Sequence, residues 1–198
     1  MEKQSRIVRF VEQVYRLVIG SLLYWKTLVS SGGLYGFVDA ADNLRAFLSS
    51  GEPTGAEKIE SLPYRKLLSF IWCVLFSVVL AGYLLIGKGK GSEMTLFLWI
   101  MITMAFVLYH IFLVTLVVLD KENERILSNG LLYAHALDHM FRNPTKSLYI
   151  LVLSVSALLI GFFNLILFVF LVPSLYWWLL TKGMGQQKKQ PKIVAGST

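Results

Sequence analysis

The sequence predicts an all-α integral membrane protein, a helical bundle with four to five spans and additional amphipathic helices at the membrane interface. The first observation is a set of three long runs without a charged residue: Leu67–Ile86, Met94–Leu119 and Leu148–Leu180. About 20 apolar residues in a helix cross the hydrocarbon core of a bilayer. The second is the composition, which is 56% hydrophobic with a mean hydropathy of +0.62. The third is the placement of Trp and Tyr near the ends of the runs, at the depth of lipid headgroups.

The remaining composition narrows the functional classes. The net charge of +7 is assigned to basic segments facing an anionic cytoplasmic leaflet, and not to nucleic-acid binding. The single cysteine, Cys73, excludes a disulfide within the chain and a cysteine-based metal cluster. No cleaved signal peptide is recognised at the start of the sequence. We expect one polytopic membrane domain over residues 1–185 and a polar, disordered tail over 186–198.

The N-terminal part predicts two amphipathic helices. Residues 1–16 have apolar positions at helical spacing, so this helix lies on the membrane surface or leads into a first span. Residues 17–38 are ambiguous, because Lys26 interrupts an apolar stretch and costs about 2.5–3.5 kcal/mol at the centre of a span. A break follows at Ser30–Gly33. After it, residues 34–48 form a second amphipathic helix near the interface, with Asp39, Asp42 and Arg45 on its polar side.

The rest of the chain alternates loops and apolar helices. Residues 51–61 are polar and predict a loop before the first long run. The connection at 87–92 is so short that the two runs flanking it must be antiparallel neighbours. A helix is expected over Asn129–Arg142. The last run, at about 1.5 Å per residue, is too long for one perpendicular crossing. It either kinks at Pro173 or folds back near Gly161–Asn164.

Basic residues predict the orientation in the membrane. Loop 39–66 and segment 120–147 lie on one side and together hold eight Lys and Arg residues, whereas turn 87–93 on the other side holds two. The positive-inside rule makes the first side cytoplasmic in a multi-pass protein of the cell membrane. A fold-back in the last run brings the basic C-terminal tail to the same side, so we prefer two short spans there.

Three residues are candidates for a ligand-binding or buried polar site. Lys26 and His110 are ionisable groups at membrane depth, and Asn164 is polar at that depth. Such groups are functional candidates because their burial is costly. The alternatives are that Lys26 extends to the interface, that His110 bonds a neighbouring carbonyl, and that Asn164 forms a contact between helices or caps a fold-back.

A weaker candidate is a metal site at His135, Asp138 and His139. Their spacing places all three on one face of a helix, as two-histidine metal sites require. No Glu follows His135, so the metalloprotease pattern is absent. A polar face at the cytoplasmic surface is the preferred interpretation, and we expect no metal and no cofactor.

Two stretches carry a resemblance to a known family. The first contains Leu22–Trp25, then Gly32–Gly36, then Ala40-Ala41. The second is Leu131–Leu148, which ends a helix in Arg142-Asn143-Pro144 before the last run; Pro173–Leu175 matches the family's ending. With these motifs the chain resembles the YesL-like family of bacterial membrane proteins of unknown function, over residues 10–182. The usual proline of the first segment is replaced here by Ser30-Ser31. The resemblance implies a role beside a carbohydrate-uptake transporter and no catalytic residue.

The sequence shows no Walker motif, no nucleophile elbow and no paired intramembrane carboxylates, so we expect no enzyme. The leading hypothesis is a non-enzymatic accessory subunit, embedded in the lipid bilayer and packed against a transporter subunit of a carbohydrate ABC importer. A small transporter or ligand-binding bundle is the alternative, a membrane enzyme the third, and a homo-oligomer stays open. The expected contact surface consists of small residues around the break, because these permit close approach of helices: Ser30, Gly32, Gly33, Gly36, Ala40 and Ala41.

Overall fold

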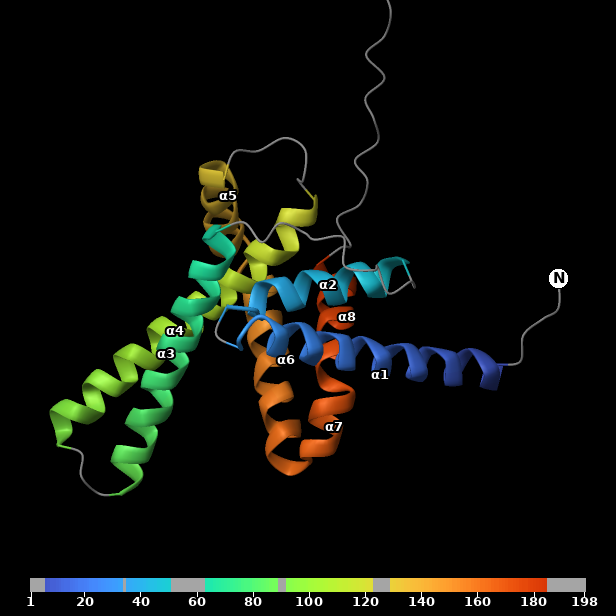
Figure 1. Cartoon of the computed structure of the whole chain (residues 1–198). Helices are drawn as coiled ribbons and strands as arrows, with labels where there is room; N and C mark the ends of the chain where they lie inside the picture. Colours follow the sequence, from blue (N-terminus) through green and yellow to red (C-terminus); the bar gives the residue numbers. More distant parts are fainter. Residues whose placement is uncertain (1–5, 34, 51–62, 89–91, 123–128, 185–198) are drawn as a thin grey trace, which may run out of the picture.

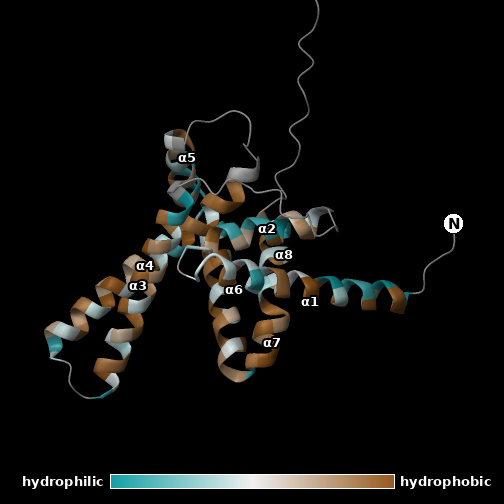
Figure 2. Ribbon diagram, in the orientation of Figure 1, coloured by the Kyte–Doolittle hydropathy of each residue, from teal (hydrophilic) through white to brown (hydrophobic). Residues whose placement is uncertain are grey.

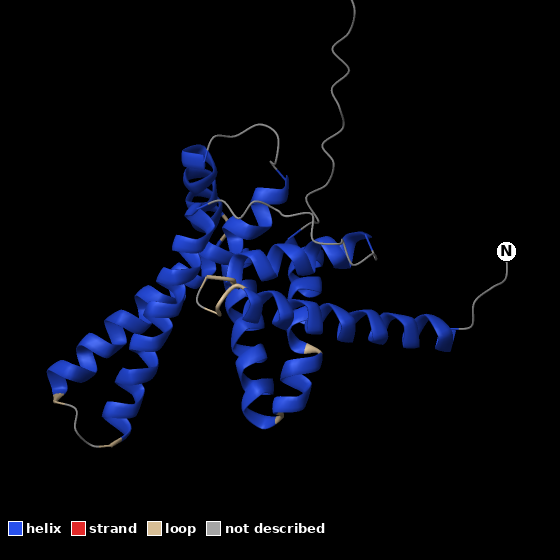
Figure 3. Ribbon diagram, in the orientation of Figure 1, coloured by secondary structure: helices blue, strands red, loops and turns tan. Residues whose placement is uncertain are grey.

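The computed structural model describes residues 6–33, 35–50, 63–88, 92–122 and 129–184, and the predicted loop at 51–61 and tail at 186–198 lie outside them. The described residues form helices and short connections without a strand (Figure 3). The helices are α1 (Arg6–Ser30), α2 (Phe37–Ser50), α3 (Pro63–Gly87), α4 (Glu93–Glu122), α5 (Asn129–Arg142), α6 (Pro144–Phe163), α7 (Leu165–Phe170) and α8 (Val172–Met184).

Two antiparallel hairpins dominate the architecture (Figure 1). Helices α3 and α4 form the first, and α6 with α7 and α8 forms the second. Trp99 in α4 donates a hydrogen bond from its indole N–H to the carbonyl of Val79 in α3 at 2.9 Å, which confirms that the two helices are neighbours. Both hairpin tips point to the same side, away from α2 and α5 (Figure 1).

The last apolar run folds back at Asn164. The Asn164 N–H bonds the carbonyl of Ile160 at 2.8 Å, and its side-chain oxygen accepts from the N–H of Leu167 at 3.0 Å. The residue thus ends α6 and begins α7. Further along, the Tyr149 hydroxyl donates to the carbonyl of Leu179 at 3.0 Å, so the returning arm runs antiparallel to α6.

The other alternative for this run, a break near Pro173, also occurs, as a second interruption of the helix. Helix α7 ends at Phe170, and α8 begins at Val172, next to Pro173. Proline lacks the N–H that a continuing helix needs, and it fits the first turn of a new one. The returning arm is therefore two short helices, broken at Leu171.

Helix α1 joins the segment expected at 1–16 to most of the ambiguous segment at 17–38. It is continuous from Arg6 to Ser30, with Lys26 inside it. Its end follows the predicted break, where Gly32 and Gly33 have φ angles of 75° and 71°. Side chains other than glycine rarely adopt this left-handed conformation, so the two glycines fix the turn into α2.

Three described helical stretches are long and apolar enough to cross a membrane: Arg65–Gly87, Glu93–Leu119 and Pro144–Phe163. Apolar residues extend around both hairpins toward their tips (Figure 2). Of the four to five spans expected, three thus have helices of suitable length and composition. Helix α1 is not among them, and Arg16 and Lys26 interrupt its more apolar C-terminal part.

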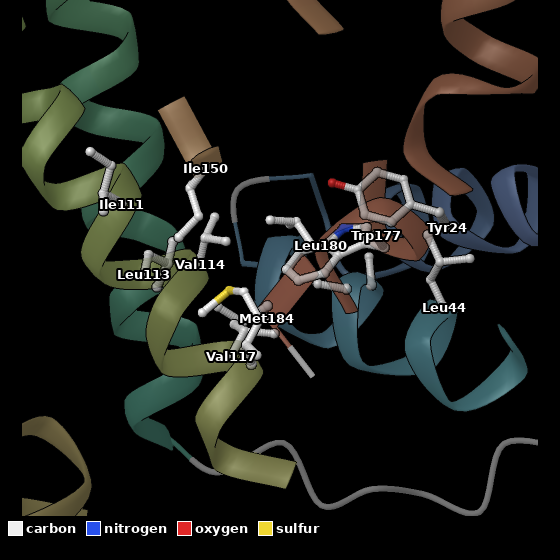
Figure 4. Close-up of a cluster of buried hydrophobic side chains, with 14 of the residues drawn as sticks. Tyr24, Leu44, Ile111, Leu113, Val114, Val117, Ile150, Trp177, Leu180 and Met184 are labelled. Carbon is white, nitrogen blue, oxygen red and sulfur yellow. The ribbon is translucent and has the colours of Figure 1, made fainter. Parts of the chain in front are cut away.

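The densest packing lies where the hairpins meet α2, and the tips contribute little to it. Leu44 of α2, Val114 of α4, Ile150 of α6 and Leu180 of α8 are fully buried together with Trp177, which is 2% exposed. Figure 4 shows these side chains converging from four helices. Buried apolar contact therefore joins the two hairpins at one end, and their far ends depend on their surroundings.

Candidate functional site

His110 lies at the centre of a hydrogen-bonded cluster that connects four helices. Its Nδ1 is 3.1 Å from the indole nitrogen of Trp72 in α3. Its Nε2 is 2.9 Å from the hydroxyl oxygen of Ser154 in α6. The hydroxyl of Tyr176 in α8 lies 3.0 Å from the same Ser154 oxygen. We call Trp72, His110, Ser154 and Tyr176 the histidine cluster.

The chemistry of these groups determines which nitrogen of His110 carries its hydrogen. An indole nitrogen only donates, so Nδ1 of His110 accepts from Trp72 and Nε2 carries the hydrogen. That N–H donates to Ser154, whose own hydroxyl donates to the carbonyl of Ile150 at 2.8 Å. When the Ser154 hydroxyl donates to Ile150, its remaining lone pair can accept from Tyr176. Both ring nitrogens are thus engaged, and the imidazole is neutral in this arrangement.

Aromatic side chains enclose the histidine cluster. Phe37 at the start of α2 stacks on Trp72 with ring centroids 4.6 Å apart. Phe106 packs against both Trp72 and His110 at 5.7 and 6.3 Å. A polar group is tolerated at membrane depth when its hydrogen bonds are made internally. The arrangement therefore acts chemically as a clamp between helices.

The other two predicted ligand residues lie elsewhere. Lys26 is exposed on α1, and Asn164 is exposed at the tip of the second hairpin, where it caps α7. The structure does not bring either of them to His110. The prediction that Asn164 caps a fold-back describes its position correctly, and the exposed position of Lys26 fits the reading in which its charge extends to the interface.

The predicted contact surface around the break is divided by the fold. Ser30, Gly32 and Gly33 are exposed, whereas Gly36, Ala40 and Ala41 are buried in the chain's own core. A Cβ at Gly36 would lie 2.6 Å from the Cβ of Ser31. The second group is consequently unavailable to a partner, since small residues there let α2 approach its neighbours within the chain.

The metal-site candidate on α5 is not assembled. His135 and Asp138 are exposed, and Asp138 pairs with Arg142 at 2.9 Å. His139 is turned inward, 9% exposed, with Nε2 at 3.4 Å from the amine of Lys146. Within the described ranges of the chain, no group of three His, Cys, Asp or Glu side chains is arranged to hold a metal ion.

Three arginines form a second polar region, around α2. Arg16 of α1 donates to the carbonyls of Phe47 and Leu48, which belong to the last turn of α2. Arg45, 8% exposed, donates to the carbonyls of Val117 and Val118 near the end of α4. Cations at helix C-termini oppose the helix dipole and satisfy free carbonyls. Arg45, predicted on the polar side of this helix, is thus buried against the end of α4.

The third arginine joins α3 to α2. Arg65 forms an ion pair with Asp42 at 2.6 Å, and both side chains are largely buried. Asp39, one turn earlier on α2, is half-buried. Burial raises the pKa of the Asp39 carboxyl, and the charges of Arg65 and Lys66 oppose that rise. The start of α3 is thus held to α2 by charge as well as by packing.

Sequence reasoning identified His110 but missed its partners. Trp72, Ser154 and Tyr176 are ordinary residues of apolar runs, and their distance from His110 along the chain gives no signal. The arginines could be anticipated only as basic residues at span ends. Searches against protein-family models, curated proteins and solved structures find no match to this chain. The resemblance to the YesL-like family therefore stays a prediction.

Proposed function

We propose that this chain is a non-enzymatic accessory subunit that packs within the bilayer against a larger membrane complex. The observation that carries the proposal is the outward face of α3. On this face Cys73, Ser77 and Ala81 follow one another at intervals of one helical turn. Ser77 and Ala81 are exposed, and none of the most apolar window of α3 is buried within the chain.

The face is free because α4 packs on the opposite side of α3. The contacts with α4 come from Trp72, Val79 and Gly82, and a Cβ at Gly82 would collide with the ring of Trp99. These positions lie about half a helical turn away from Ser77. The hydroxyl of Ser77 bonds the carbonyl of Cys73 at 2.8 Å, so the face presents little polarity.

Small residues matter in lipid because apolar area alone gives no preference for protein over lipid tails. A row of small side chains lets another helix approach closely and gain dispersion contacts. As the partner, we propose the membrane subunit of a carbohydrate ABC importer, on the strength of the YesL-like resemblance. The alternative of a small transporter requires Lys26, His110 and Asn164 in one cavity, and these residues lie apart.

The proposal includes an orientation in the cell membrane. We propose that the side holding α2 and α5 is cytoplasmic, as the count of basic residues indicates, and that the α7–α8 arm crosses alongside α6. Single cysteines at Ser49 and Ser92, in a Cys73→Ala background, are treated with an impermeant thiol reagent on intact cells. Labelling at Ser92 alone is expected. Labelling at Ser49 alone would show that the protein has the opposite orientation in the membrane.

The partner surface is tested with two matched variants, Ser77→Leu and Ser156→Leu. Both serines are exposed on apolar helices, and both bond the carbonyl four residues earlier at 2.8 Å. Each variant is affinity-purified from the native host in mild detergent. We expect the wild type and Ser156→Leu to retain the importer subunit, and Ser77→Leu to lose it.

Two other results would overturn parts of the proposal. Equal retention by both leucine variants shows that the α3 face is not the contact surface. A wild-type protein that purifies without a partner, yet binds a sugar, refutes the accessory role and favours the transporter alternative. A partner of the same mass as the chain would identify a homo-oligomer.

A further inference from the structure

Helix α1 exposes one continuous apolar stripe along its length. Ile7 is 73% exposed, Val11 58%, Leu22 42% and Val29 74%. Their spacings of 4, 11 and 7 residues are close to whole numbers of helical turns, so the four side chains share one side of the helix. We call this set the α1 stripe. These four apolar side chains are thus largely exposed along the length of one helix.

The contacts of α1 show which way the α1 stripe faces. Trp25 follows Ile7 by about five turns and therefore lies on the same side. Its indole donates to the carbonyl of Val169 in α7 at 2.9 Å, and its ring packs against Phe168. Arg16 follows Ile7 by two and a half turns, lies on the opposite side, and bonds the end of α2.

The stripe thus faces the side on which the apolar hairpin extends, and its back faces the arginine region around α2. In Figure 1, α1 runs across the view while α6 and α7 run down it. The N-terminal half of α1 projects beyond the other helices (Figure 1) and is apolar on its lower edge (Figure 2). This geometry places α1 level with one surface of the bilayer that the hairpins enter.

The charges of α1 complement anionic lipid. The helix carries four basic residues and one acidic residue, Glu12. Arg6 and Arg9 belong to the projecting half and lie away from the α1 stripe. Lys26, exposed at the flank of the stripe, is placed so that its alkyl stem covers apolar surface while its amine reaches the headgroups. Basic residues near such a surface bind anionic headgroups.

We propose that α1 is an in-plane interfacial helix that binds a lipid surface containing anionic headgroups, with the α1 stripe inserted among the acyl chains. It does not cross the bilayer. The protein then has α3, α4 and α6 as spans, completed by the α7–α8 arm, and α1 is a lateral strut at the interface. This inference concerns the lipid contact of α1 and stands independently of the partner proposed for α3.

The test measures depth in the bilayer. Single cysteines at Ile7, Val11, Leu22 and Val29, with Gln13 as the control on the opposite side, are introduced into the full chain in a Cys73→Ala background. Each is labelled with a nitroxide in nanodiscs of phosphatidylcholine with phosphatidylglycerol. The relative accessibility to oxygen and to a water-soluble nickel chelate gives the depth of each label. All positions are exposed, so labelling leaves the core packing intact.

We expect the four stripe positions to lie at one depth, about 5–10 Å below the headgroups, with Gln13 accessible to the nickel chelate. A crossing helix would instead separate Val11 from Val29 by about 27 Å in depth. Either that separation, or nickel accessibility at all four stripe positions equal to that of Gln13, overturns the proposal. In discs without phosphatidylglycerol, the labels at Ile7 and Val11 should become shallower. Unchanged depth there refutes the preference for anionic lipid.

Discussion

Replacing Ser154 by alanine should destabilise the protein by removing the shared acceptor of the histidine cluster. The Ser154 oxygen is 2.9 Å from Nε2 of His110 and 3.0 Å from the hydroxyl of Tyr176. The variant removes both of these bonds and leaves only the 3.4 Å contact between the Tyr176 hydroxyl and Nε2 of His110. The bond that Ser154 donates to the carbonyl of Ile150 is local to α6, and its loss contributes little.

The magnitude follows from the number of hydrogen bonds between helices. A hydrogen bond in a folded protein contributes about 0.5–1.5 kcal/mol net. Between membrane helices the average is about 0.6 kcal/mol, with a maximum near 1.7. Two bonds lost together therefore predict about 1–3 kcal/mol. Ser156→Ala is the matched control, because Ser156 makes the same bond to the carbonyl four residues earlier and is exposed. Its free energy of unfolding should change by less than about 0.5 kcal/mol.

The assay is SDS-induced unfolding of the purified protein in detergent, followed by circular dichroism. A double-mutant cycle with Tyr176→Phe makes the test stricter. In the wild type this substitution removes a satisfied hydroxyl and should destabilise. In the Ser154→Ala background the hydroxyl keeps only its 3.4 Å contact with Nε2 of His110, so the substitution should destabilise less than in the wild type. Equal stability of Ser154→Ala and Ser156→Ala, or equal effects of Tyr176→Phe in both backgrounds, would refute the described arrangement.

Three further predictions concern other parts of the fold. Asp39→Asn should be at least as stable as the wild type at pH 7, because a raised pKa means that folding favours the protonated carboxyl. The difference in stability should vanish below the unfolded pKa of about 3.9, and thermal melts at both pH values measure it. A variant less stable than the wild type at pH 7 would contradict a raised pKa of Asp39. Gly20→Ala should destabilise by about 1–3 kcal/mol in the same SDS assay, since its Cβ would lie 2.6 Å from the hydroxyl oxygen of Ser174 and 2.9 Å from Leu44. Asn164→Ala should cost about 1 kcal/mol by loss of the α7 cap, and no change in the unfolding midpoint would show that the cap is dispensable.

The elements predictable from sequence are those specified by local composition. The three charge-free runs correspond to helices because lipid requires every backbone group to bond within its segment. The fold-back at Asn164 is one of two alternatives for the last run, and the distribution of Lys and Arg residues favours it over a kink at Pro173. The turn at Gly32 and Gly33 was visible because glycine tolerates left-handed backbone conformations. In each case the identities of a few neighbouring residues are enough to predict the local backbone structure.

The features missed by sequence reasoning depend on residues far apart in the chain. Ser154 and His110 meet only after α4 and α6 pack, and nothing near Ser154 distinguishes it from exposed Ser156. The continuity of α1 through residue 30 could not be decided from sequence, because Lys26 indicates a costly interruption of a span. That cost applies to a crossing helix, and it disappears when the lysine sits exposed at the flank of the helix. Gly36 and its neighbours on α2 were assigned to a partner because small residues indicate close packing without indicating against which chain.

The bonds that hold α1 to the end of the chain impose an order on biosynthesis. Trp25 contacts a carbonyl 144 residues later, and the hydroxyl of Ser21 accepts from the backbone N–H of Ser174, 153 residues later. At a synthesis rate of about 5–20 residues per second, these partners are synthesised roughly seven to thirty seconds after α1. During that interval Ser21 and Trp25 lack their partners in α8 and α7 while α3, α4 and α6 are being synthesised. Helix α1 thus completes its contacts with α7 and α8 only after α3, α4 and α6 have been synthesised, and a ribosome stalled before α8 would leave these contacts unmade and open to quality-control factors.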